Sequence, residues 1–584
     1  MYEDLLLEVK RPAQYIGHEW NSSRKSFDAA YLKFALSFPD LYEIGMSNLG
    51  IRIIYGLLND LPDVVCERFF AVDGDLEKQL RLSNREILSL ESRRKLADFD
   101  FIGFSLGSEL DYTNVLNILD LSSFPFKASE RNHYYPLVIG GGPCTLNPEP
   151  MHDFFDLFVI GEAEGPILQI LSHYRQNKEA YRAGKISKSQ LLFLFSGIEG
   201  VYVPSLYKVN YDDTGKIRSF VSNQNNPILK IKKSFVKELA SSYYPQKWIV
   251  PYTQIIHDRV TVEIMRGCPN RCRFCQARLQ YFPLRYRNPE LVLNLANDIC
   301  KDTGYEEISL SGLSVSDYPG LDLLLERLSG LLKPNGVGIS LPSIKAKDIV
   351  GKASVSIAKF KKTGLTFAPE AGSERLRDLL AKDFNCESFF RALREAYSCG
   401  YQHVKLYFMI GLPSEKDDDL DAIVEFSSRV SDLRKELGKP AAAVNISINT
   451  LIPKPHTALQ WFSMSPLEEI EYKQDYLRNK FKRLKKLKVS FHDPKMSFLE
   501  GVLSRGDRRL SSVILNAFNK GARFDAWGSH FDFGLWSSSF QEANIDPYFY
   551  LQRRGVDETL PWDFIDTGIP RSVLVEDFNK TIAI

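Results

Sequence analysis

The sequence lacks three features that would set it apart from ordinary globular proteins. No apolar run approaches the ~18 residues that a membrane-spanning helix requires, so we expect no such helix. The first residues, MYEDLLLEVKRP, lack the basic start and the long apolar core of a signal peptide. Net charge is also nearly absent, with 74 basic and 73 acidic side chains. The overall balance therefore favours neither a nucleic-acid partner nor an acidic substrate, and any basic surface must be local.

Cysteine is scarce as well, with 8 residues in 584. A secreted disulfide framework is denser and more regular, so we expect a reducing, cytoplasmic setting. Five cysteines are dispersed along the chain: Cys66, Cys144, Cys300, Cys386 and Cys399. The other three are close together in the stretch EIMRGCPNRCRFCQAR, as Cys268, Cys272 and Cys275.

The spacing C-x₃-C-x₂-C allows three interpretations. A zinc site usually shows paired C-x₂-C or Cys/His elements and four ligands, and the nearest upstream histidine here is His257. A disulfide does not suit the compartment or the odd number of thiols. An iron–sulfur cluster is held by cysteine thiolates, and three of them would leave one iron open. We favour the cluster, with zinc as the alternative.

The order of predicted elements indicates an α/β protein. From about residue 33 to 175, apolar strands such as LKFALSFPD, FDFIGFSL and YPLVIGGGP alternate with helical segments. That pattern predicts a parallel sheet covered on both faces, with ligands at the carboxyl ends of its strands. A second series starts near Val260 and includes EEISLSGLSV, HVKLYFMIGLPSE and AVNISINTLIPKP. It predicts a full or partial (β/α) barrel.

The motif CPNRCRFC closely resembles that of the radical S-adenosylmethionine (radical SAM) superfamily. The resemblance implies a [4Fe-4S] cluster on Cys268, Cys272 and Cys275, with the amino and carboxylate groups of SAM on the open iron. Reductive cleavage of SAM would then give a 5′-deoxyadenosyl radical. Phe274 stands where the family has an aromatic residue near the adenine.

Later strand ends also resemble the family's SAM-binding loops. The resemblance implies that Gly312 and Ser314 approach SAM, that Glu370 and Ser373 hold its methionyl or ribose groups, and that further contacts come from Met409, Gly411 and Lys345. Many family members have arginine where Lys345 stands. The alternative is that these are barrel turns with helix caps, since Ser373 followed by Glu374 suits a helix start.

The stretch FPDLYEIGMSNLG resembles the cobalamin-binding domain of cobalamin-dependent radical SAM proteins. In that family the motif D-x-H-x-x-G places a histidine under cobalt, and here Asp40, Tyr42 and Gly45 take the D, H and G positions. Tyrosine is a poor cobalt ligand unless ionised, and its pKa of ~10 opposes ionisation. Either cobalamin binds without a protein axial ligand, at loops that include Ser105 and Gly141, or the domain keeps the fold without the cofactor.

Five motifs in order, from FPDLYEIGMSNLG through SRGDRRLSSVI and GARFDAW to LPWDFIDTGI, resemble one subfamily over nearly the whole chain. It is a radical SAM subfamily with a B12-binding domain, related to methylthiotransferases and often encoded with a small partner protein. The predicted fold is a flavodoxin-like, cobalamin-binding-type sheet with a connector (1–235), a radical SAM partial barrel (236–475) and a mixed C-terminal region (476–584).

The C-terminal region is locally basic and aromatic. Apolar Phe481, Leu484 and Leu487 predict an amphipathic helix whose outer face carries Lys480, Lys482, Arg483, Lys485, Lys486 and Lys488. We favour a solvated surface helix over an RNA contact. A second basic patch is predicted at Arg505, Arg508 and Arg509. The aromatics Trp527, Phe531, Phe533 and Trp536 suit a core better than a base-stacking platform.

We therefore expect an enzyme that cleaves SAM and modifies a macromolecule, with methylation or methylthiolation of RNA or a ribosomal protein suggested by family analogy. Its partners would be an electron donor such as a flavodoxin or ferredoxin, a small partner protein and RNA. Methylthiolation needs a second cluster or sulfur source, and the N-terminal domain offers only Cys66 and Cys144. The alternatives are a cluster-containing RNA-binding or scaffold protein and a zinc nucleic-acid module. The sequence assigns no catalytic residue beyond the cofactor sites.

Overall fold

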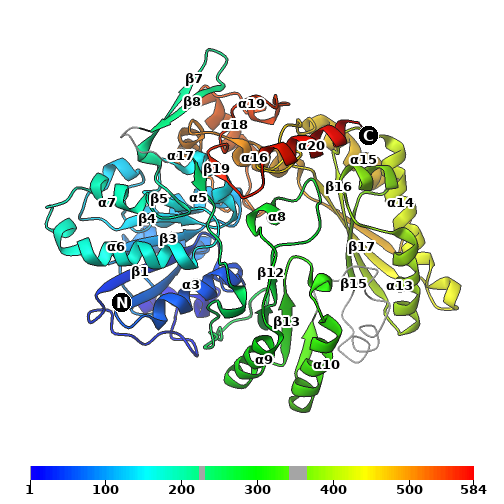
Figure 1. Ribbon diagram of the computed structural model, residues 1–584, viewed down its shortest axis with the longest axis horizontal. Helices are drawn as coiled ribbons and strands as arrows, with labels where there is room; N and C mark the ends of the chain where they lie inside the picture. The colour runs from blue at the N-terminus through cyan, green and yellow to red at the C-terminus, as the bar shows by residue number, and fades with distance from the viewer. Residues whose placement is uncertain (1, 223–229, 341–364, 584) are drawn as a thin grey trace. The chain divides into compact units, whose positions relative to one another are not determined.

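The computed structural model describes residues 2–222, 230–340 and 365–583, and the chain forms two compact units (Figure 1). The first unit contains Met1–Asp258, Val502–Tyr550 and Asp557–Gly568. The second contains Arg259–Gly501, Leu551–Val556 and Ile569–Ile584. C-terminal segments thus contribute to both units, and the predicted boundaries at residues 235 and 475 stay a prediction.

The first unit is built on a six-stranded sheet in the order β2-β1-β3-β4-β5-β6. Five of its strands are parallel, and β6 (Val201–Tyr202) runs antiparallel to β5. The parallel strands are β1 (Leu32–Phe38), β2 (Val64–Phe70), β3 (Phe101–Ser105), β4 (Leu137–Gly141) and β5 (Leu157–Val159). Their side chains are buried almost throughout, as continuous apolar strands covered on both faces should be. The predicted flavodoxin-like parallel sheet is confirmed.

The order of the strands creates a switch point between β1 and β3. The chain passes from β1 to β2 on one side, through α3 (Leu49–Asp60), and then crosses to β3 on the other side of β1. Parallel pairing sets Ser37 of β1 against Phe104 of β3, so both strands end at the same edge. A crevice at such a point is the usual ligand site of an open α/β sheet.

A buried ion network secures the N-terminal residues to this sheet. Arg68 on β2 has no exposed surface, and its Nη2 lies 2.7 Å from Glu19 Oε2 while its Nε lies 2.6 Å from Glu91 Oε1. Tyr42 donates its hydroxyl to Glu19 Oε1 at 2.8 Å. Three segments distant in sequence are thereby connected through one guanidinium.

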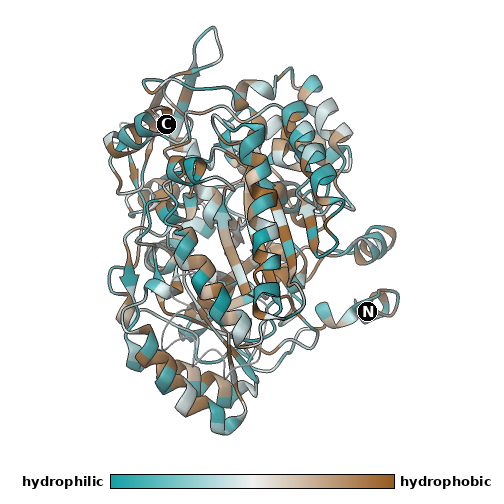
Figure 2. Cartoon of the chain, turned by 90° about the vertical axis from the view of Figure 1, so that its right-hand side faces the viewer, coloured by the Kyte–Doolittle hydropathy of each residue, from teal (hydrophilic) through white to brown (hydrophobic). Residues whose placement is uncertain are grey.

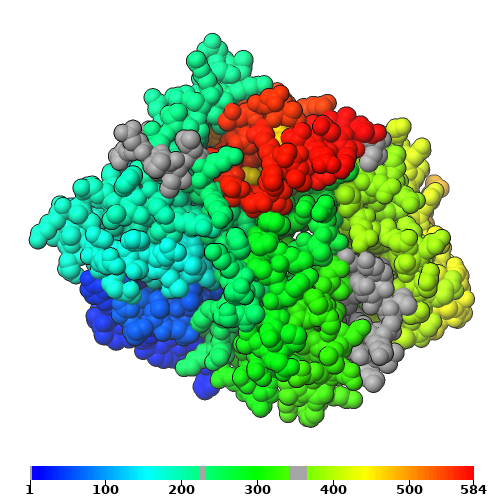
Figure 3. Space-filling model, viewed as in Figure 1, coloured from blue at the N-terminus to red at the C-terminus, as the bar shows by residue number. Residues whose placement is uncertain are grey.

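C-terminal helices and a hairpin complete the first unit. The helices are α17 (Leu510–Asn519), which packs against α5 (Tyr112–Asp120), and α18 (Phe533–Glu542), which packs against α17. The hairpin of β7 (Tyr207–Tyr211) and β8 (Ile217–Ser222) projects from the surface of the unit (Figures 1 and 3). Strand β19 (Ile565–Asp566) pairs with β9 (Ile231–Lys232).

The second unit contains two parallel sheets. One has β10 (Val260–Glu263), β13 (Glu307–Ser311) and β14 (Gly338–Ser340), and the other has β15 (Leu365–Glu370), β16 (His403–Ile410), β17 (Ala443–Thr450) and β18 (Leu487–Phe491). Helices α9 (Pro289–Thr303), α10 (Leu321–Leu332), α13 (Cys386–Ser398) and α14 (Asp417–Asp432) connect successive strands. This repeated βα order confirms the partial barrel, and the described residues form no closed barrel.

Helices of the second unit bury one face against the larger sheet. Leu420, Ile423 and Val430 of α14 join a core that includes Leu406 and Ile446 of the strands. Figure 2 shows these helices banded in teal and brown, as expected for one exposed and one buried face. None of the described helices is both long and apolar enough to cross a bilayer.

The predicted amphipathic helix in the basic run is wrong. Helix α15 (Leu467–Phe481) ends where that run begins, and a turn leads into β18 at Leu487. Phe481 and Leu487 are nevertheless buried, with Leu484 packed beside them. The basic side chains of the run are exposed: Lys482, Arg483, Lys485, Lys486 and Lys488. The buried and exposed positions were therefore predicted correctly, although the element that carries them was not.

Candidate functional site

The cysteine loop follows the first strand of the second unit. Strand β10 is followed by β11 (Met265–Arg266), the loop with Cys268 and Cys272, and α8 (Gln276–Gln280), which begins directly after Cys275. Arg273 fixes the loop, since its backbone N–H donates to Leu380 O at 2.9 Å and its Nη1 to Leu379 O at 2.8 Å. The loop is thereby held at the end of α12 (Glu374–Leu379).

The three thiols are close enough to influence one another. Burial raises the pKa of Cys272 to about 11; the Lys382 ammonium opposes that rise, and repulsion from Cys275 and Cys268 adds to it. Burial also raises the pKa of Cys275. Thiolates in this position need a positive partner, which iron supplies. The donor set therefore fits a cluster.

In the described part of the chain, no three His, Cys, Asp or Glu side chains converge on one metal-ion position. The cysteines of a [4Fe-4S] cluster bind separate irons and need not converge in that way.

A polar chain that the sequence reasoning missed borders the first cysteine. Asn270 Nδ2 lies 3.3 Å from Cys268 Sγ and 3.5 Å from Asp317 Oδ2. Ser314, a predicted SAM contact, donates its hydroxyl to the same Asp317 oxygen at 2.6 Å. Gly312 lies against Met265, whose Cγ would be 2.5 Å from an added Cβ. Both predicted residues are thus near the cysteine loop, and contact with SAM stays a prediction for them.

Glu370 also lies near the cysteines, and it belongs to the four-stranded sheet of the unit, whereas the cysteine loop follows the three-stranded sheet. Its Oε1 is 3.0 Å from Lys382 Nζ, and its backbone has a φ of +70° at the end of β15. Burial raises the pKa of Glu370, while the Lys382 ammonium lowers it. The predicted SAM ligand is therefore one half of an ion pair, and Lys382, which also influences Cys272, is the half that the sequence reasoning missed.

Ser373 shows the helix-capping role that was its alternative interpretation. Its hydroxyl accepts from Leu376 N at 3.4 Å, at the start of α12, and donates to Asp419 Oδ1 at 2.5 Å. Arg375 Nη2 pairs with the other oxygen of Asp419 at 2.5 Å. The loops that follow β15 and β16 are thereby fixed to each other.

Phe274 and Met409 meet on one apolar cluster. Both pack against residues that include Leu376 and Leu412. Gly411 has a φ of +78°, and its N–H donates to Glu415 Oε2 at 2.7 Å, an oxygen that also pairs with Lys473 at 2.9 Å. The predicted adenine contacts thus share a fixed apolar wall. Lys345 lies outside the described residues.

A loop after β17 also approaches the cysteine helix. Gln276 Nε2 donates to Pro455 O at 3.3 Å, and His456 is buried with a φ of +62°. The sequence reasoning treated AVNISINTLIPKP as a strand and made no prediction for the residues that follow Pro455. The available signal was His456, Thr457 and Gln460 among apolar residues directly after Pro455, because binding residues often lie on loops that follow strands.

Gly372, between Glu370 and Ser373, allows a test of the loop geometry. An added Cβ would lie 2.3 Å from Ile423 N and 2.6 Å from Ala422 C, which are backbone atoms that cannot rotate away. We expect Gly372→Ala to cost about 1–3 kcal/mol of unfolding free energy, seen as a lower Tm. Gly330→Ala, in α10 with open space around the described position, should hold or raise Tm. Equal Tm values for both variants would contradict the packing.

The cobalamin-type residues of the first unit have other partners. Tyr42 is buried, its hydroxyl is donated to Glu19, and burial raises its pKa, so it cannot replace the family's histidine. An added Cβ on Gly45 would lie 2.3 Å from the Phe70 ring. Ser105 and Gly141 face each other across β3 and β4 at the strand ends. Any cobalamin here would bind without an axial ligand from Tyr42.

Asp111, just before α5, carries a buried carboxyl. Its Oδ1 has no hydrogen-bond partner among the described residues. Burial raises the pKa of Asp111 well above its usual value, and repulsion from Asp40, Glu109 and Asp525 adds to the rise. The folded state therefore holds this proton more tightly than the unfolded state, whose pKa is about 3.9. Below that pH the carboxyl is protonated in both the folded and the unfolded state, so its ionisation does not change the free energy of unfolding. As pH rises above that value, ionisation increasingly destabilises the folded state.

We expect Asp111→Asn to raise Tm at pH 8 and to change it little at pH 4, since the amide cannot ionise. Thermal denaturation at the two pH values measures the difference. Asp120→Asn, which removes a surface pair with Arg81, should lack this pH-dependent gain. The same Tm change for Asp111→Asn at both pH values would show that its carboxyl is not destabilising.

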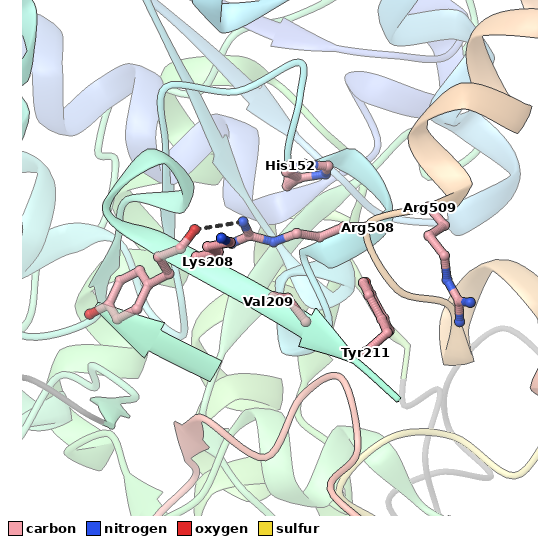
Figure 4. Close-up of a pocket in the computed structure, with 7 residues that line it drawn as sticks. His152, Lys208, Val209, Tyr211, Arg508 and Arg509 are labelled. Atoms are coloured by element: carbon pink, nitrogen blue, oxygen red, sulfur yellow. Dashed lines mark hydrogen bonds between the residues drawn. The ribbon is translucent and has the colours of Figure 1, made fainter. Parts of the chain in front are cut away.

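The second predicted basic patch is wrong because its arginines have structural partners. Arg508 donates to Glu149 Oε2 at 2.6 Å and to Tyr207 O at 2.8 Å, and Arg509 Nη2 lies 2.7 Å from Asp507 Oδ2. Figure 4 shows the two guanidinium groups pointing in different directions beside a cavity of about 420 Å³. Arg505 is buried and donates to Tyr550 O. Of the aromatics predicted to be core, Trp536 is buried, and Trp527, Phe531 and Phe533 are half-buried.

The sequence of this chain is similar to those of two known proteins. A protein of Methanocaldococcus jannaschii, MJ0966, is 29% identical over 517 residues, 86% of this chain and 98% of that protein. The ribosomal protein uS12 methylthiotransferase RimO of Pelotomaculum thermopropionicum is 24% identical over 199 residues, 32% of this chain and 43% of that protein.

Among solved structures, the cobalamin-dependent SAM radical enzyme OxsB with aqua-cobalamin bound has a TM-score of 0.47 at 14% identity, covering 94% of this chain and 77% of that chain. The radical SAM methyltransferase TsrM of Kitasatospora setae has a TM-score of 0.43 at 13% identity, over 71% of this chain and 74% of that chain.

Two family models match the chain itself. Residues 50–204 match the model of the N-terminal region of radical SAM proteins, and residues 262–427 match that of the radical SAM superfamily. The second match contains Cys268, Cys272 and Cys275 together with the loops at Glu370 and Gly411. The chain therefore carries a radical SAM domain at residues 262–427, preceded at residues 50–204 by the N-terminal domain found in radical SAM proteins.

Proposed function

We propose that this protein is an enzyme that cleaves SAM reductively and uses the resulting radical to modify a macromolecule. The observation that carries the proposal is the loop of Cys268, Cys272 and Cys275, held by Arg273 at the end of α12 beside the Glu370–Lys382 pair. When bound to these three thiolates, a [4Fe-4S] cluster would supply the electron and leave one iron for the amino and carboxylate groups of SAM.

The residues around the loop would bind SAM and stabilise the thiolates. Phe274 and Met409 offer an apolar wall that suits an adenine ring. The Glu415–Lys473 pair holds the loop at Gly411 in place, so the wall is preorganised. The Lys382 ammonium places a positive charge near Cys272, where it stabilises thiolate.

Methylation is the better supported form of the reaction. The RimO similarity over 199 residues suggests methylthiolation, which requires a second cluster or another sulfur source. Cys66 and Cys144 are both buried in the first unit, and Cys66 lies within strand β2, so neither is placed to bind a second cluster. An RNA or protein substrate, a small partner protein and a flavodoxin or ferredoxin as electron donor complete the proposal.

Anaerobic reconstitution tests the proposal. We expect about four irons and four sulfides per chain and, with dithionite and SAM, formation of 5′-deoxyadenosine measured by mass spectrometry. Comparison of RNA and protein from a deletion strain and its parent would then identify the modified macromolecule. One tightly held zinc and no iron would overturn the proposal.

A cluster without SAM cleavage would favour a scaffold instead. In that case the candidate residues for an RNA contact would be the exposed basic side chains of Lys482, Arg483, Lys485, Lys486 and Lys488.

A further inference from the structure

The switch-point crevice of the first sheet is occupied by the chain itself. Residues 522–536, which we call the capping segment, run from the turn after α17 into the start of α18 and belong to the same unit as the sheet. Trp527 donates its indole N–H to Asp40 Oδ1 at 3.0 Å, directly after β1. The capping segment therefore reaches the edge at which an open α/β sheet binds its ligand.

The start of α5, which follows β3, binds the capping segment from the other side of the crevice. Thr113 Oγ1 donates to Asp525 Oδ2 at 2.6 Å, and Phe524 N donates to Asn114 Oδ1 at 2.8 Å. Asn114 also donates to Pro39 O at 2.8 Å, so one amide bridges the β1 loop and the capping segment. The loop after β1 and the start of α5, which form the two walls of the crevice, are thus both hydrogen-bonded to the capping segment.

The capping segment contains several buried residues. Asp525 is 1% exposed and also accepts the indole N–H of Trp536 at 2.8 Å. Ala522 and Phe524 are buried, and so are Thr113 and Asn114 opposite them. Phe524 has a φ of +51°, a conformation that a bulky residue holds only when its surroundings fix it.

Two of the predicted cobalamin contacts already have hydrogen-bond partners within the unit. Asp40, which the sequence predicted as a cobalamin contact, accepts from Trp527 and from Leu41 N. Tyr42 is bonded to Glu19 inside the unit. A corrinoid would have to compete with several buried hydrogen bonds and would gain no ligand from Tyr42 in return.

We infer that the capping segment holds the switch-point crevice closed and that a corrinoid can bind there only by displacing it. The inference rests on the contacts of Asp40, Thr113, Asn114 and Asp525, and it is independent of SAM cleavage. It changes the role of the N-terminal domain from a preformed cofactor site to a docking site for the chain's own C-terminal residues.

Hydroxocobalamin titration of the full-length protein, followed by visible absorbance, tests the inference. Trp527→Phe removes the indole N–H while keeping an aromatic ring, and we expect it to bind hydroxocobalamin about 5–10-fold more tightly than the unmodified chain. Thr113→Val, on the opposite wall, should act in the same direction. Hydrogen exchange of residues 522–536 should increase when hydroxocobalamin binds.

Glu542→Gln is the matched control, because Glu542 lies in α18 outside the capping segment and pairs with Lys520 at the surface at 2.8 Å. Its affinity for hydroxocobalamin should equal that of the unmodified chain. The inference is overturned if neither Trp527→Phe nor Thr113→Val gains affinity. It is also overturned if the unmodified chain binds hydroxocobalamin while residues 522–536 stay protected from exchange.

Discussion

Replacing Cys272 with alanine is expected to remove the cluster and to reduce SAM cleavage to background. Cys272 is the middle ligand of the three. Alanine removes its thiol but keeps its backbone carbonyl, which accepts from Cys275 N at 3.2 Å, so the variant removes one ligand and retains this backbone bond of the loop. Two thiolates cannot hold a cluster that is designed around three. Iron and sulfide analysis after anaerobic reconstitution, together with 5′-deoxyadenosine formation, measures both effects.

Cys399→Ala provides the control for that experiment. Cys399 is exposed at the end of α13, in the same unit as the cysteine loop but in a different element. Its variant should keep the iron content and the cleavage rate of the unmodified chain. If Cys272→Ala retained the same iron content and activity, the ligand assignment would be wrong.

Replacing Arg68 with methionine should destabilise the first unit by about 3–5 kcal/mol, because it leaves Glu19 and Glu91 buried without their cation. Burial already raises the pKa of Glu91, while Arg68 opposes that rise. The free energy of local unfolding can be measured by hydrogen exchange in peptides that cover β1 and β2. Peptides from β16 and β17, in the second unit, should be unaffected.

Arg94→Met is the comparison for this variant. Arg94 pairs with Asp28 at the surface of the same unit, where such a pair contributes about 0–1 kcal/mol. A similar small effect for Arg68→Met would mean that water reaches the Glu19–Arg68–Glu91 network in solution.

The sequence predicted the parts of the fold that depend on local pattern. Continuous apolar strands such as LKFALSF and FDFIGFSL identified the parallel sheet, because burial on both faces leaves no alternation. The spacing of Cys268, Cys272 and Cys275 likewise allowed a prediction of the cluster loop, since ligands that are close in the sequence form a recognisable motif, and the cluster on these three residues stays a prediction.

Long-range partners were beyond that kind of reasoning. Arg508 looked like a free cation until Glu149, 359 positions away, was found beside it. Tyr42 looked like a replaced cobalt ligand, and only the structure showed its hydroxyl on Glu19. The basic run misled because Phe481, Leu484 and Leu487 repeat every three residues through a helix end and a turn alike, so burial alone did not define the element.

The return of residues 502–550 to the first unit has a consequence for how the chain is made. A ribosome must synthesise the whole radical SAM domain before α17 and α18 emerge to cover α5. During translation, Thr113 and Asn114 therefore lack their hydrogen-bond partners until residues about 410 positions later have been synthesised. A chain that is cut or stalled before residue 502 would expose this edge of the sheet, so completeness of synthesis is a condition for a closed N-terminal domain.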